Sequence, residues 1–232
     1  MRRFLLSLLL IVTIVTLCAS AAWAEPTSFV GHKISTSSSP CVLVVFWPEG
    51  EERPAHAQIF EGLYFSRYPV MREVYGTTDA LEVTVFFHHA PDSIAYTDGQ
   101  SIFVSIEYMD AHPEDYNLLV HELFHVVQNG YAGDDPFIPV LVEGMADYAR
   151  ARYSYHQDDN WSLSAWQEGQ SYMDSYTVTG GFLNWIAQRY GETTLIRLNR
   201  ILHEGYYTPD VWSNYTGCTL DELWAEYAKE GK

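Results

Sequence analysis

The residues His121-Glu122-Leu123-Phe124-His125 form the pattern H-E-x-x-H. On a helix, residues four apart lie about 40° apart around the axis and about 6 Å apart along it, so both imidazoles can reach one metal ion. Glu122 follows the first histidine and can approach a metal-bound water without taking a coordination position. Two neutral nitrogen ligands and a free carboxylate are what a zinc hydrolase requires. The alternative is a pair of helix histidines that only pack or form hydrogen bonds.

A catalytic zinc site usually has a third protein ligand and one open position. Glu143 lies 18 residues after His125 in an otherwise apolar segment, where a carboxylate without a cation would be costly. We therefore expect Glu143 to be the third ligand. Asp147, on the same helical face, is expected to hold the second ring nitrogen of a ligand histidine and is the alternative third ligand. If neither acid binds metal, both belong to a solvated acidic face.

The ligand types also suggest which metal binds and how it would be used. Two histidines and one glutamate suit a single Zn²⁺ ion, although manganese and cobalt accept the same ligands. A zinc-bound water has a pKa near about 7. We expect Glu122 to act as the general base that takes a proton from this water.

The segments before the motif are predicted to form a sheet. Apolar runs rich in β-branched and aromatic residues predict strands at residues 41–47, 81–88 and 101–108. Residues 25–40 are polar and rich in serine, and are expected to form a loose entry segment. Residues 90–99 are expected to form a loop.

The segments with helical periodicity lie mostly after the motif. Helices are predicted at residues 55–75, 116–129, 139–153, 176–190, 193–203 and 220–229. In the first of these, Ile59, Leu63, Val70 and Val74 are expected to share one face, and Pro69 to kink or split the helix. The order indicates an α+β chain, with an N-terminal mixed sheet and a mainly helical C-terminal half.

The last predicted helix has a recognisable start. Thr219 is expected to be its N-cap, with Glu222 at capping-box spacing. Residues 154–171 are expected to form a long loop or an irregular helix.

Composition excludes some functions. The 232 residues include 30 acidic and 13 basic side chains, for a net charge of −17 at pH 7. This balance argues against nucleic acid or an anionic membrane surface as a partner. Hydrophobic residues make up 47% of the chain, enough to bury a core.

The N-terminus has the pattern of a secretory signal peptide. Two arginines precede an apolar run that ends in Ala22-Trp23-Ala24, a small-x-small cleavage signal. We expect residues 1–24 to be removed and residues 25–232 to form one domain, secreted to the extracellular space or periplasm, with no stable membrane insertion after cleavage. The alternative is an uncleaved N-terminal anchor.

Two cysteines remain in the mature chain. Cys41 and Cys218 either form one disulfide or are two buried thiols, and the sequence leaves both open.

Several segments resemble the basic secretory protein family, the metallopeptidases of plants and bacteria. The matching segments are HELFHVVQNGY (121–131), VEGMADYAR (142–150), SYTVTGGFLNWI (175–186), LNRILHEGYY (198–207) and TLDELWAEYAK (219–229). The resemblance implies a zincin-like domain of the gluzincin type, in which the third ligand is a glutamate on the helix after HExxH. It thus supports Glu143 as ligand and Asp147 behind the ligands. The chain is strongly acidic, so no polyanion-binding role follows from the family name.

The resemblance also suggests how the oxyanion is stabilised and where substrate binds. Tyr176 opens the shared YTVTGGFL block and is expected to donate to the oxyanion, followed as candidates by Tyr206 and, more remotely, by Tyr172 and His203. By analogy with similar metallopeptidases, the strand at residues 101–108 is expected to present its edge to an extended peptide.

The sequence therefore predicts a secreted zinc metallopeptidase, an endopeptidase that acts on protein or peptide. One alternative is a peptidase specialised for glycosylated protein, suggested by Trp161 and Trp166. The other is a non-catalytic secreted binding protein that retains the fold.

Overall fold

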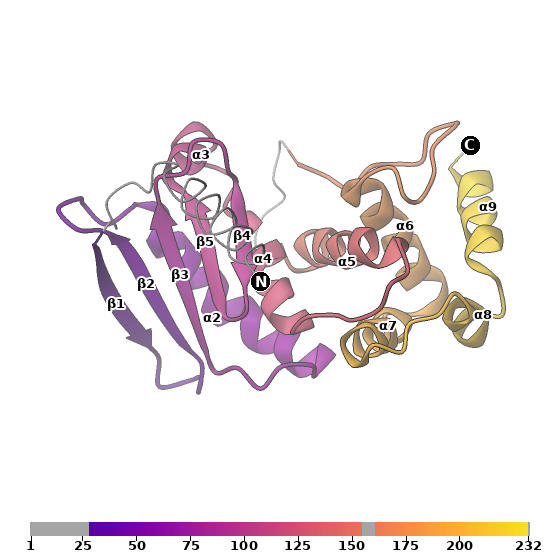
Figure 1. The fold of residues 1–232 in the computed structure, drawn as a ribbon, viewed down its shortest axis with the longest axis horizontal. Helices are drawn as coiled ribbons and strands as arrows, with labels where there is room; N and C mark the ends of the chain where they lie inside the picture. Colours follow the sequence, from indigo (N-terminus) through magenta and orange to yellow (C-terminus); the bar gives the residue numbers. More distant parts are fainter. Residues whose placement is uncertain (1–27, 155–160, 232) are drawn as a thin grey trace, which may run out of the picture.

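A computed structural model describes residues 28–154 and 161–231. The expected signal peptide, residues 1–24, lies outside these ranges. Within them the chain forms five strands and eight helices, with the sheet at one end and most helices at the other (Figure 1). The elements are β1 (Phe29–Ser35), β2 (Val42–Pro48), α2 (His56–Tyr75), β3 (Glu82–His88), β4 (Ala95–Asp98), β5 (Ser101–Ser105), α3 (Ile106–Ala111), α4 (Leu118–Gln128), α5 (Phe137–Tyr153), α6 (Tyr176–Tyr190), α7 (Thr193–Glu204), α8 (Asp210–Thr216) and α9 (Leu220–Glu230).

The sheet is mixed and has the strand order β1-β2-β3-β5-β4. Strands β2, β3 and β5 are parallel, and the two outer strands pair antiparallel to their neighbours. The mixed α+β architecture predicted from the sequence is therefore confirmed.

Three expectations about the strands were wrong. Residues 29–35, expected to be loose, form the outer strand β1, and residues 95–98, expected to lie in a loop, form the opposite outer strand β4. Strand β5 consequently lies between β3 and β4 and has no free edge, and residues 106–111 are the helix α3. The β4–β5 hairpin turns at Gly99, which has φ 59°. An Asp-Gly pair is a hairpin signal, and it was available at residues 98–99.

Of the four residues of α2 expected to share one face, Leu63 is buried and the other three are exposed. Ile59, Val70 and Val74 are 41%, 46% and 36% exposed. The buried face carries aromatic residues, including Tyr64 and Tyr68, whose hydroxyls donate to the main-chain oxygens of Val42 (2.8 Å) and Ala80 (2.9 Å). A buried tyrosine is tolerated when its hydroxyl has such a partner, so these residues and not the aliphatic ones face the sheet.

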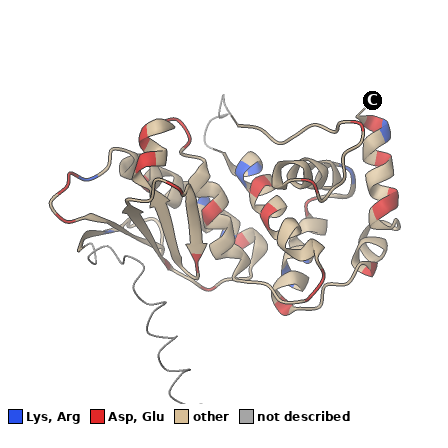
Figure 2. Ribbon diagram, turned by 45° about the horizontal axis from the view of Figure 1, so that its top comes forward, with Lys and Arg blue, Asp and Glu red and all other residues tan. Residues whose placement is uncertain are grey.

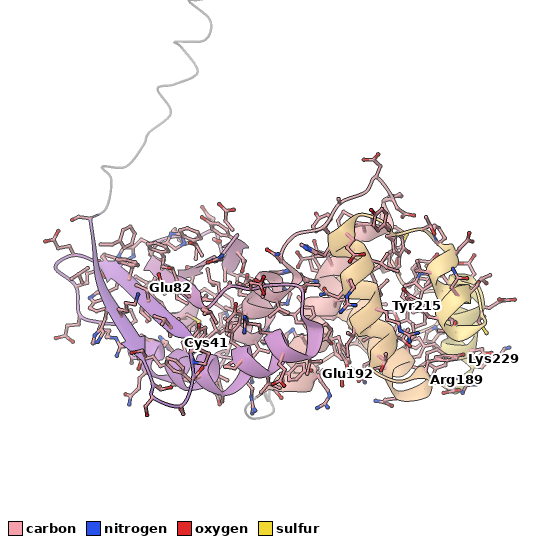
Figure 3. The ribbon with its side chains drawn as sticks, turned by 90° about the horizontal axis from the view of Figure 1, so that it is seen from below. Cys41, Glu82, Arg189, Glu192, Tyr215 and Lys229 are labelled. Carbon is pink, nitrogen blue, oxygen red and sulfur yellow. The ribbon has the colours of Figure 1, made fainter. Side chains whose placement is uncertain are left out.

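Pro69 lies inside α2, which is one helix of 20 residues, so of the two expected effects the split is excluded. The view from below shows α2 running along the sheet (Figure 3). No helix in the described ranges has both the length and the apolar character needed to cross a membrane.

The helical half packs closely around α5 and α6. Gly144 on α5 faces Thr179 on α6, and a Cβ at Gly144 would lie 2.5 Å from the Thr179 Cγ2 atom. The expected capping box is present at the start of α9, where Thr219 and Glu222 exchange both hydrogen bonds. Helix α8 was not predicted, and residues 161–171 contain no helix.

Cys41 and Cys218 are both free thiols. Cys41 is buried beside the sheet, whereas Cys218 lies between α8 and α9. Figure 3 shows Cys41 in the part of the molecule that contains the sheet, and Tyr215, three residues before Cys218, in the helical part. The sequence left open either a Cys41–Cys218 disulfide or two separate thiols, and the structure has separate thiols.

Candidate active site

Helix α4 presents the two histidines of the HExxH motif on one face. The Nε2 atoms of His121 and His125 are 3.1 Å apart. The helix ends at Asn129, whose left-handed backbone (φ 56°) turns the chain away, and α5 then packs against α4. This packing places the Glu143 Oε2 atom 3.3 Å from the Nε2 of His121 and 3.6 Å from that of His125.

These three atoms fit the geometry of one metal ion. In the described part of the chain, His121, His125 and Glu143 are the one cluster of histidine, cysteine or acidic side chains arranged to hold a cation. A tetrahedral ion with ligand bonds of about 2.0–2.1 Å would separate its ligand atoms by about 3.3 Å. The three observed separations lie on either side of this value, and the donor types are those that zinc prefers.

Both imidazoles are oriented by a side chain behind them. Asp147 accepts a hydrogen bond from the Nδ1 of His121 (2.9 Å), and Gln128 accepts one from the Nδ1 of His125 (2.6 Å). The Gln128 amide also donates to the Val142 main-chain oxygen on α5 (2.9 Å). Both rings thereby direct Nε2 at the cluster, as ligand histidines usually do. Gln128 was not identified from the sequence, although its position three residues after His125 places it within reach on the same helix.

The cluster has the electrostatics of a cation site. Burial disfavours a charged His121, but hydrogen bonds to Asp147 and Glu143 outweigh it and raise the pKa of His121 to about 10. Burial likewise opposes the charge on Glu143, yet hydrogen bonds from the two histidines lower its pKa well below the usual range. These groups thus hold a proton in the absence of metal, and a bound metal ion would replace that proton.

Glu122 lies beside the cluster, and a residue of the sheet holds it in place through a hydrogen bond. It is 4% exposed, and its Oε2 accepts a hydrogen bond from the Thr97 hydroxyl on β4 (2.7 Å). The same hydroxyl lies 3.1 Å from the Glu122 main-chain oxygen. Thr97 was missed because its segment was expected to be a loop.

A cavity of about 740 Å³ contains all of these groups. Its wall includes the edge strand β4, and five aromatic residues line it: Tyr96, Tyr108, Tyr131, Trp161 and Tyr176. At one end, Arg150 pairs with Asp115, and its guanidinium lies 4.0 Å from the centroid of the Trp161 ring. The cavity therefore combines a polar centre with several aromatic residues in its wall.

The four residues considered for the oxyanion occupy different places. Tyr176, at the start of α6, lines the cavity and is 50% exposed. Tyr206, Tyr172 and His203 are not among the lining residues; the Tyr172 hydroxyl donates to Asp221, and His203 donates to the Asn129 main-chain oxygen. Tyr131 lines the cavity as well, and the sequence had not suggested it.

Comparison with known families identifies the class of protein. The model of a family described as peptidases of plants and bacteria matches residues 53–227, about three quarters of the chain. The chain therefore belongs to this family of peptidases, which confirms the resemblance to the basic secretory protein family. A comparison with curated proteins finds no match.

Comparison with solved structures supports the fold. The chain is similar to an aminopeptidase N family protein from Idiomarina loihiensis, with a TM-score of 0.55 and 10% sequence identity. The similarity covers 86% of this chain and 46% of that one, so this chain spans less than half the length of its structural neighbour. At this identity the likeness concerns the fold alone.

Proposed function

We propose that the protein is a secreted zinc metallopeptidase with a zincin-like domain. The observation that carries the proposal is the convergence of two Nε2 atoms and one carboxylate oxygen at 3.1–3.6 Å, with a second carboxylate in the same cavity. Membership of a peptidase family supports the reaction class. The predicted signal peptide and the family's secretory name support export.

In this proposal each residue of the site has one task. His121, His125 and Glu143 would hold the ion, and Asp147 and Gln128 keep the two imidazoles oriented. When bound, Zn²⁺ supplies a water of lowered pKa and polarises the scissile carbonyl. Glu122 accepts a proton from the attacking water and delivers it to the leaving amine.

The oxyanion needs a donor that reaches into the cavity. Tyr176 is the proposed donor because it lines the cavity and its ring is half exposed. Tyr131, which is 49% exposed and lines the same cavity, is the second candidate.

The substrate is proposed to bind along β4. This strand has one free edge and four of the lining residues come from it or precede it directly, at residues 94–97. An extended peptide can add to such an edge through main-chain hydrogen bonds. Binding on both sides of the scissile bond would suit an endopeptidase that acts on protein or peptide.

The test is a paired measurement on wild type and Glu122→Gln. Metal content and hydrolysis of casein are measured on the purified proteins. We expect about one zinc per chain in both proteins, because Glu122 is not a ligand. Casein hydrolysis is expected only in the wild type, since the variant cannot accept the proton.

Other outcomes would redirect the proposal. Zinc without hydrolysis of casein or of a glycosylated protein would favour a binding protein that retains the fold. Hydrolysis only of the glycosylated protein would favour the specialised peptidase suggested by Trp161. Absence of metal from both proteins would show that the assignment of His121, His125 and Glu143 is wrong.

A further inference from the structure

The sheet has an aromatic row on the face turned away from its helices. The register aligns Phe46 on β2, Phe86 on β3, Phe103 on β5 and Tyr96 on β4 as direct neighbours. These four residues are called the aromatic stripe. Residues on the opposite face of the same strands, such as Val45, belong to the buried core. In Figure 1 the strands lie in front of α2.

The rings of the stripe stack on one another across the strands. Successive ring centroids are 4.9, 5.0 and 4.7 Å apart, with interplanar angles of 10°, 9° and 11°. These separations match the spacing of neighbouring strands, so the rings stand upright on the sheet and turn their edges outward. At the far end, Gly31 on β1 lies opposite Phe46, and a Cβ there would be 2.3 Å from that ring.

A face of this kind is unusual in the interior of a sheet. Parallel strands are commonly covered on both faces, and β2, β3 and β5 are parallel. Here Tyr96 is 48% exposed and Phe29, which packs edge-on against Phe86, is 38% exposed. Phe46, Phe86 and Phe103 are half-buried by their stacked neighbours, so part of each ring stays in contact with water.

The stripe is continuous with the cavity. Tyr96 is its last residue and also lines the cavity, as does Ile94, which is 50% exposed. The stripe runs across the strands, so a polypeptide bound along β4 reaches it by turning across the sheet at Tyr96. Phe46 lies about 15 Å beyond Tyr96, a distance that about five extended residues span.

Charge and ring orientation restrict what binds there. The five strands carry only three charged residues, of which Lys33 and Glu82 form a pair at 2.6 Å. Figure 2 shows the strands almost free of charged positions. A chain of net charge −17 is repelled by an anionic membrane surface. Sugars stack on ring faces, whereas this stripe offers ring edges, so an apolar polypeptide suits it better.

We propose that the aromatic stripe is a docking surface for an apolar or aromatic stretch of the polypeptide substrate, which runs from the cavity at Tyr96 to Phe46, about five residues farther along the substrate. The proposal rests on the proposed peptidase function. It implies that the enzyme prefers long, unfolded substrates over short peptides that fill only the cavity.

The experiment compares long and short substrates in two variants of β2. Phe46→Thr removes the stripe residue farthest from the cavity, and Val44→Thr is the matched control, two residues away on the same strand and face. For Phe46→Thr we expect the KM for casein to rise about 5–10-fold with kcat unchanged, because apolar contact is lost. The kcat/KM for a peptide of about six residues should not change. Val44→Thr should match wild type on both substrates.

A binding measurement separates this proposal from the peptidase function. Fluorescence anisotropy of labelled casein is measured with Glu122→Gln and with Glu122→Gln combined with Phe46→Thr. Weaker binding to the double variant would support the docking surface even if the wild type hydrolyses nothing. Hydrolysis by wild type with equal casein KM in Phe46→Thr would overturn the docking surface alone.

Two controls cover folding and self-association. If Phe46→Thr does not fold, Phe29→Ser replaces it, since Phe29 is more exposed and contacts the stripe through Phe86. Equal losses on casein and on the short peptide would indicate a general structural effect and overturn the proposal. So would sedimentation that shows a wild-type dimer lost in Phe46→Thr, because the stripe would then bind a second copy.

Discussion

Thr97 is the residue through which the sheet holds the proposed general base. Its hydroxyl donates to the Glu122 carboxylate at 2.7 Å, and its neighbours on β4 line the cavity. A hydrogen bond to a charged group contributes roughly 1.5–3 kcal/mol. This contact therefore fixes which way the carboxylate points before substrate arrives.

Thr97→Val keeps the shape of the side chain and removes this hydrogen bond. We expect kcat for casein to fall at least about tenfold while KM stays near the wild-type value, because orientation of the base and not substrate contact is lost. Thr84→Val on β3, remote from Glu122, is the control. An unchanged kcat would show that Glu122 is oriented without Thr97.

At the scale of residues, the sequence predicted the relative positions of side chains that belong to one helix. His121, Glu122 and His125 are related by helical spacing alone, so their arrangement followed from the motif. Thr97 approaches Glu122 from a strand 25 residues earlier in the chain, and no local pattern links the two. The catalytic and ligand roles of these residues stay predictions.

At the scale of elements, the position of Glu143 depends on how closely α5 packs against α6. Gly144 follows Glu143 and provides the close approach, since a Cβ there would also lie 3.3 Å from the Gly180 main-chain nitrogen. The main chain of α6 cannot move aside to make room for this Cβ, as a flexible side chain could. The contact therefore requires glycine for space, although the backbone at this position is helical.

We expect Gly144→Ala to lower the free energy of unfolding by about 1–3 kcal/mol, because the added methyl group overpacks the helix interface. Gly62→Ala in α2 is the matched control. A methyl group at Gly62 would have no neighbour within 4 Å, so alanine should raise the free energy of unfolding by about 0.5–1 kcal/mol. Urea denaturation followed by circular dichroism measures both. Equal effects in the two variants would contradict this account of the interface.

Among the elements, long helices were predicted well and short outer elements were not. The third predicted helix after the sheet coincides with α6, at residues 176–190. Strand β4 has four residues and α8 has seven, too few for periodicity to be distinctive. Both faces of α2 are partly apolar. Which face is buried depends on tyrosine hydroxyls that find main-chain partners only in the folded chain.

Considered as a whole, the molecule has an N-terminal sheet followed by helices, as the order of apolar patterns predicted. The proposed metal would join α4 to α5 at the centre, between these two parts (Figure 1). A ligand that binds only the folded state stabilises it by mass action.

Metal removal should therefore lower the stability of the entire chain. With free zinc at about 100 times its Kd, binding contributes about 2.7 kcal/mol, so chelation should lower Tm by about 5–10 °C. Differential scanning calorimetry with EDTA, and then with excess zinc, measures the loss and its recovery. The His121→Ala variant should show no response to EDTA. A Tm that EDTA leaves unchanged in the wild type would contradict zinc binding by these residues.

The three proposed ligands lie within 23 consecutive residues, on two helices joined by one short connection. Closing a short loop costs little chain entropy, so this helical pair can assemble early. Eighty-nine residues still follow Glu143 in the chain. A polypeptide emerging from the ribosome or an export channel would thus present its complete ligand set before α6, which carries Tyr176, completes the cavity wall.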